Sequence, residues 1–164
     1  MPFPVDEVED GTGKPTATVY EQHEAAASWL LNQGYTKFDE LDDLDQQAAM
    51  RHATSIGEDA LRPYFRGVAY TTGQGLLFPA IGAYGGDGVL LDPRALPVVY
   101  LQAIRLLAEH HAAGTLLRFA GGPPGIKEER SRQGAIVYRD GVDFSTVRTN
   151  HPEVWNKLLA VMPP

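Results

Sequence analysis

The stretch of this sequence that comes nearest to a chemical motif is GTGKPT, at residues 11–16. A phosphate-binding loop needs G-x-x-x-x-G-K-[ST], where a hydroxyl follows the lysine and helps to hold Mg²⁺. Here Val8 stands where the first glycine belongs, and Pro15, which has no N–H to donate, follows Lys14. The acidic pair at residues 9–10 would also repel a phosphate. The pattern therefore predicts a glycine-rich turn that leads into a helix.

Histidines are the other residue type that could do chemistry. The chain has five, namely His23, His52, His110, His111 and His151. The densest group is Glu109-His110-His111, but adjacent residues on a helix point about 100° apart and cannot share one metal as histidines at i and i+4 do. We expect one of the pair to face the core and the other to face water, and we predict no metal site and no cofactor.

Nucleophilic and acid–base catalysis lack their usual settings. The chain has no cysteine, which excludes thiolate catalysis, disulfides and cysteine-ligated zinc. None of Ser28, Ser55, Ser131 and Ser145 lies in a strand–turn–helix elbow. The acids of FDELDDLD, residues 38–45, fit the start of a helix better than a matched acid–base pair. We therefore predict that the protein is not an enzyme.

Charge limits the partners that we expect. The net charge is −7, and the excess of acids lies in residues 1–62, whereas the rest of the chain is slightly basic. Such a surface disfavours tight nonspecific binding to a phosphate backbone. The acidic face either serves solubility or lies beside DNA that must pass without sticking.

Aromatic and arginine side chains provide one possible nucleic-acid contact. Arg62 and Arg66 lie near five aromatic residues, which are Tyr64, Phe65, Tyr70, Phe78 and Tyr84. Arginine with aromatic rings can stack single-stranded bases. The same side chains could equally fill an ordinary core and pack loops, since no dense basic stripe surrounds them.

The elements that position these residues are mostly helical. Helical spacing predicts helices near residues 18–34, with a capping box made by Thr18 and Glu21, near 42–61, near 97–117 and at the C-terminus. Residues 67–96 form a long irregular loop, and residues 126–141 a β-hairpin that turns near residues 133–134. The length and the 43% hydrophobic content suit one ordinary core.

These elements predict a mainly α fold, a helical bundle with a small β-hairpin and an extended C-terminal arm. Residues 1–120 would form the helical core with its loop at 67–96, and residues 121–164 the hairpin and the arm. We expect no signal peptide and no membrane partner, because no basic region precedes an apolar stretch and no apolar run approaches the length of a membrane span.

The last segment has a strongly apolar face. Trp155, Leu158, Leu159 and Met162 follow the i, i+3, i+4, i+7 spacing of one helix face. Such a face must dock, either on the chain's own core or on a neighbouring subunit. On the second alternative, truncation after Asn150 should abolish assembly and leave a folded core.

The order of these features is more specific than any one of them. VEDGTG (8–13), RHATSIGEDALRPYFRG (51–67), QGLLFP (74–79) and the C-terminal PEVWNKLLAVM (152–162) follow one another along nearly the whole chain. This series resembles the tailed-phage head-to-tail adaptor proteins, also called connector or head-completion proteins, whose relatives often carry the label DnaT-like single-stranded DNA-binding protein. The family's Q-x-L-x-W-P-R motif is matched at Gln74, Leu76 and Pro79, whereas Phe78 replaces the tryptophan and Ala80 the arginine.

The resemblance implies a structural protein of the virion, located at the head–tail junction after synthesis in the host cytoplasm. About twelve copies would form a ring beneath the portal protein, with a tail or stopper protein on the other side and DNA passing through without specific binding. The apolar face of the last segment (Trp155, Leu158, Leu159, Met162) would contact the portal or a neighbouring subunit. Some of the acids Asp39, Glu40, Asp42, Asp43 and Asp45 would line the channel. The alternative is a single-stranded DNA-binding replication protein, whose affinity should fall steeply with salt.

Overall fold

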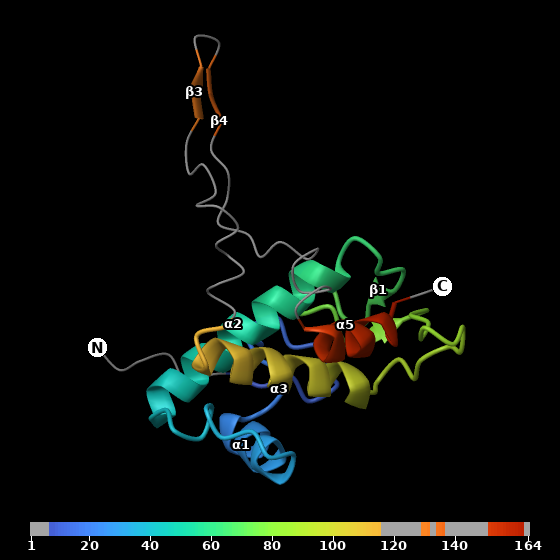
Figure 1. The fold of residues 1–164 in the computed structure, drawn as a ribbon. Coiled ribbons are helices and arrows are strands. Elements are labelled where there is room, and N and C mark those ends of the chain that lie inside the picture. Colours follow the sequence, from blue (N-terminus) through green and yellow to red (C-terminus); the bar gives the residue numbers. More distant parts are fainter. Residues whose placement is uncertain (1–6, 116–128, 132–133, 137–150, 163–164) are drawn as a thin grey trace.

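The computed structural model describes residues 7–115, 129–131, 134–136 and 151–162. These residues form four α-helices and two small antiparallel sheets, which confirms the predicted mainly α fold with a β-hairpin (Figure 1). The helices are α1 (His23–Asn32), α2 (Asp43–Leu61), α3 (Val98–Ala112) and α5 (Pro152–Leu159). The strands are β1 (Val68–Ala69) paired with β2 (Ala80–Ile81), and β3 (Glu129–Ser131) paired with β4 (Gly134–Ile136). The predicted domain boundary at residues 120–121 lies outside the described residues.

The centre of the fold is the contact between α2 and α3, which run side by side (Figure 1). A Cβ at Gly57 would lie 2.3 Å from the Cδ1 atom of Ile104 and 3.1 Å from the hydroxyl of Tyr100. Any larger residue would therefore force the side chains of Ile104 and Tyr100 to shift. Gly57 thus leaves room on α2 for two buried side chains of α3.

The first helix is shorter than predicted, and the predicted capping box does not form. The N-cap of α1 is Gln22, and its side chain makes no capping hydrogen bond. The backbone N–H of Thr18 donates to the carbonyl of Glu7 (2.9 Å), as part of a short parallel bridge. Glu21 instead accepts two hydrogen bonds from Arg105 on α3, each 2.6 Å long. The carboxylate of Glu21, which local spacing assigned to the helix cap, therefore forms a bidentate ion pair with another helix.

The second helix begins as predicted. Asp42 is its N-cap and accepts a hydrogen bond from the backbone N–H of Asp45 (2.9 Å), while Asp43 and Asp45 occupy the first turn. Leu44, also in the first turn, is 48% exposed.

Residues 151–162 do not form an extended arm. Helix α5 packs against α3 (Figure 1), and its side chains Val154 and Leu158 are buried, as are Val161 and Met162 just beyond it. The alternative of docking on the chain's own core therefore holds for these residues. Truncation after Asn150 would expose the part of the core that they cover, and the folding of the remainder stays a prediction. Among the described residues, no helix combines the length and apolar character needed to cross a membrane.

Candidate functional site

The glycine-rich turn at residues 11–16 surrounds a carboxylate of its own chain. One carboxylate oxygen of Glu9 accepts hydrogen bonds from the backbone N–H groups of Gly11 (2.9 Å) and Gly13 (2.8 Å), and the other accepts from Lys14 (2.8 Å). Gly11 and Gly13 have φ values of 90° and 75°, a conformation that favours glycine. Because the buried Glu9 takes the donors that a phosphate would need, the prediction of a turn in place of a nucleotide loop is confirmed.

A second buried carboxylate holds the turn between α1 and α2. Glu109 on α3 accepts hydrogen bonds from the backbone N–H groups of Lys37 (3.0 Å) and Phe38 (2.8 Å). The phenyl ring of Phe38 is buried in the core directly beneath. The sequence marked Glu109 only as a neighbour of two histidines, and nothing local shows that its partners lie far away on the chain.

Glu58 ties α2 to the loop that follows it. It accepts hydrogen bonds from the hydroxyls of Tyr20 and Tyr100 (the latter 3.2 Å) and from the backbone N–H of Leu77 (2.9 Å). Burial raises the pKa of Glu58 and raises the pKa of both tyrosines well above their usual value, so the phenols stay protonated and can donate. This group is fully used in holding the fold.

An open groove runs along the C-terminal half of α2. It consists of two adjoining clefts of about 340 and 200 Å³, and Arg62, Gly75 and Leu76 line both of them. Arg51 and Asp59 also line the larger cleft, so the groove carries charges of both signs.

The aromatic residues near the groove divide between core and surface. Phe78 is buried against Phe65 and Tyr100, so its proposed role in base stacking is corrected to a core role. Tyr64 is 50% exposed at the end of α2, and Phe65 lines the smaller cleft. Fewer exposed aromatic side chains therefore lie here than the sequence indicated, and base stacking stays a prediction.

Arg94 and Tyr70, an arginine–aromatic pair, already interact with each other within the chain. The guanidinium of Arg94 lies 5.9 Å from the ring centre of Tyr70, and its Nε donates to the tyrosine hydroxyl (2.8 Å). Tyr84, the last of the five aromatics, is 46% exposed.

The five acids predicted to line a DNA channel lie together around the start of α2. Asp39, Glu40, Asp42, Asp43 and Asp45 are all exposed. Lys37 donates to Glu40 (2.7 Å), and this hydrogen bond lowers the pKa of Glu40. Their exposure fits a charged surface, and the channel role stays a prediction.

The four residues predicted to contact a partner fall into two groups. Leu158 and Met162 are 1% and 5% exposed in the chain's own core, so in this conformation they do not reach a partner. Trp155 is half-buried and Leu159 is 43% exposed, and these two stay available.

An apolar cleft opens next to the C-terminal end of α5. Its volume is about 360 Å³, and Leu91, Pro97, Val98, Val99 and Val161 supply its apolar lining. Val98 is 64% exposed at the first position of α3.

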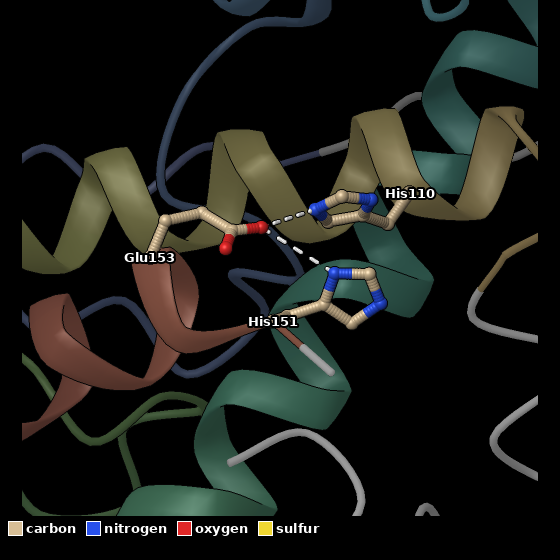
Figure 2. Close-up of side chains that lie close together, drawn as sticks. All are labelled: His110, His151 and Glu153. Carbon is tan, nitrogen blue, oxygen red and sulfur yellow. Dashed lines mark hydrogen bonds and ion pairs between the residues drawn. The ribbon is translucent and has the colours of Figure 1, made fainter. Parts of the chain in front are cut away.

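The adjacent histidines at the end of α3 diverge, as helix geometry predicts. The ring of His111 lies beside that of His52 on α2, with ring centres 4.6 Å apart. His110 instead meets His151, the N-cap of α5, and Glu153 in the first turn of α5 (Figure 2). No sequence pattern indicates this cluster, because it forms only when α5 docks on α3.

One comparison with known proteins gives a match. Residues 7–160 match the family described as "Putative DnaT-like ssDNA binding protein". The match spans the four helices and both sheets of the described residues. No curated protein and no solved structure matches the chain.

Proposed function

Because the chain belongs to this DnaT-like family, we propose that it binds single-stranded DNA along the groove beside the C-terminal half of α2. The observation that carries the proposal is the exposed Arg62 between the two adjoining clefts, with the half-exposed ring of Tyr64 two residues away. Arginine would meet the phosphates, and a tyrosine ring offers a face to a base whatever its identity.

The acidic net charge is compatible with DNA binding at this groove. The five exposed acids lie at one end of α2 and Arg62 just beyond the other, about 25 Å away at 1.5 Å per residue. That separation exceeds the Debye length of about 10 Å at 0.1 M salt, so the acids are largely screened from a strand at the groove. Asp59 lies in the groove itself, and we therefore expect modest affinity with a strong dependence on salt.

Fluorescence anisotropy with a labelled oligothymidine at low and moderate salt tests this function. We expect micromolar binding that weakens about tenfold in Tyr64→Ala and in Arg62→Gln, since one stacked base or one phosphate contact is lost. Lys37→Gln, an exposed cation at the far end of α2, is the matched control and should bind as wild type does. Absence of binding at low salt, or an equal loss in the control, would refute the proposal.

The apolar cleft near α5 favours a second candidate, the head-to-tail adaptor that the order of motifs resembles. Val98 and Val99 are exposed at the cleft, beside a half-exposed Leu159 on α5. Apolar side chains gathered at a cleft commonly mark a protein-binding surface. We propose that in this role the cleft meets the portal or a neighbouring subunit in a ring of about twelve copies in the virion, while a tail or stopper protein binds the opposite side. Neither candidate function requires catalysis.

Electron microscopy of the chain mixed with its portal protein tests the second candidate. Wild type should decorate the portal ring, and Val98→Glu should abolish decoration, because a charge would be buried in the contact. Leu31→Glu, which changes a 45% exposed leucine on α1, is the matched control and should still decorate. If the wild-type protein does not bind the portal ring, the adaptor role is ruled out, and the proposal of single-stranded DNA binding is unaffected.

A further inference from the structure

Three side chains that could coordinate a metal meet where α5 begins. One carboxylate oxygen of Glu153 lies 2.9 Å from Nε2 of His110 and 3.4 Å from Nδ1 of His151 (Figure 2). The two imidazole ring centres are 3.7 Å apart, and one candidate ligand atom from each residue lies within 4.8 Å of the others. Two elements far apart in the sequence, the end of α3 and the start of α5, supply this cluster.

These separations are those of ligands around one small ion. Zinc binds imidazole nitrogen and carboxylate oxygen at about 2.0–2.1 Å, so two ligand atoms of a tetrahedral site lie about 3.3 Å apart. The separations of Glu153 from the two imidazole nitrogens, 2.9 and 3.4 Å, bracket that value. The two nitrogens themselves lie within 4.8 Å of each other, so a zinc ion would draw the imidazoles into its tetrahedral arrangement.

The ring of His110 is held in the orientation that a ligand needs. The hydroxyl of Thr115 donates to the carbonyl of His110 (2.9 Å), so its oxygen can accept a hydrogen bond from Nδ1 of the same residue (3.2 Å). With the proton on Nδ1, the lone pair lies on Nε2, the atom that faces Glu153. Metal-binding histidines are usually oriented by such a hydrogen bond from the other ring nitrogen.

The other two side chains of the cluster differ in exposure. His151 is 6% exposed, so the protein encloses its imidazole. The side chain of Glu153 is 38% exposed, so water can reach the site as a fourth ligand.

We propose that His110, His151 and Glu153 form a Zn²⁺ site, completed by water, that fastens the start of α5 to the last turn of α3. The ion would reinforce the apolar packing of Val154 and Leu158 and make the docking of α5 depend on zinc. The site lies apart from the groove along α2, and it stands whichever ligand that groove takes.

Titration of the untagged full-length protein with Co²⁺ and Zn²⁺ tests the site, since a histidine tag would itself bind both ions. We expect one equivalent of Co²⁺ to give the visible absorption of a tetrahedral complex, and Zn²⁺ to displace it. Saturating zinc should raise the melting temperature by roughly 5 °C over that in EDTA. Glu153→Gln and His151→Gln should each weaken binding by at least about tenfold, and Thr115→Val by about tenfold or more through the lost orientation.

His111→Gln is the matched control, because it removes the neighbouring imidazole, which lies outside the cluster. It should bind Co²⁺ as wild type does. Circular dichroism verifies the folding of each variant. If a histidine variant unfolds, the metal affinity of Glu153→Gln, which changes a partly exposed side chain, is the decisive measurement. Wild type that binds no stoichiometric metal, or a Glu153→Gln variant with unchanged affinity, would overturn the proposal and leave a plain ion pair.

Discussion

Two regions of this molecule place a glutamate at an interface between elements, and they differ in what surrounds its carboxylate. Glu109 accepts hydrogen bonds from two backbone N–H groups in the turn before α2. Glu153 meets the imidazole nitrogens of His110 and His151. Backbone donors are fixed by the chain and have no second use once the turn has formed. Imidazoles can give up a proton and take a metal, so only the second arrangement can respond to a ligand.

Glu9 belongs with Glu109 in this comparison. Three backbone N–H groups surround its carboxylate, in a turn whose sequence resembles a phosphate loop. The comparison therefore gives a working rule for this fold. A carboxylate surrounded by backbone donors holds structure, whereas one surrounded by imidazoles is a candidate for metal binding.

Replacing the two glutamates by alanine separates the regions most sharply. Glu109→Ala leaves two backbone donors near a buried site without an acceptor, and we expect it to lower the free energy of unfolding by about 3 kcal/mol. Glu153→Ala removes a partly exposed side chain, and in EDTA we expect a loss of less than about 1 kcal/mol. Urea denaturation of both variants in EDTA measures the difference. Equal losses would show that the two carboxylates do the same structural work.

Glu58 sharpens the comparison through pH. Burial raises its pKa, so folding favours the protonated form, and the stability that this provides is present at low pH and lost as pH rises through the raised value. In Glu58→Gln that loss is absent. The free energy of unfolding of the variant should therefore increase relative to that of wild type as pH rises from 4 towards neutrality.

Thermal denaturation of both proteins over that pH range measures this trend. The difference between the two proteins isolates Glu58, because the other acids titrate alike in both. A constant difference would mean that the hydrogen bonds from Tyr20, Tyr100 and Leu77 fully offset the burial of the charge.

Local pattern was enough to predict much of the fold. Helix α2 and its cap at Asp42, most of α3, the position of α5 and the pairing of β3 with β4 follow from spacing, capping and turn chemistry, which act over a few residues. The capping box at Thr18 and Glu21 failed for the opposite reason. Its carboxylate is taken by Arg105, a residue far along the chain whose position no local pattern reveals.

The candidate sites were harder to predict than the fold. The groove was partly visible, because Arg62, Tyr64 and Phe65 are neighbours in the sequence. The histidine cluster was not, since His110 and His151 come together only through the docking of α5. The last segment showed an apolar face, but spacing alone cannot say that Leu158 turns into the chain's own core while Leu159 stays exposed.

The smallest expected effect comes from a single residue that takes part in both kinds of interaction. The backbone N–H of Lys37 donates to the buried Glu109, whereas its side chain pairs with the exposed Glu40. Lys37→Gln removes only the surface pair, which water and salt already screen, so we expect no measurable change in the free energy of unfolding.

Lys37→Pro also removes the backbone N–H, and it should lower the free energy of unfolding by about 1–3 kcal/mol, because one oxygen of Glu109 loses its donor. Urea denaturation at low and high salt compares the two variants. If the glutamine variant proves as destabilised as the proline variant, the side-chain pair matters as much as the backbone donor. The distinction between fixed backbone donors and exchangeable side chains would then fail at a residue that displays both.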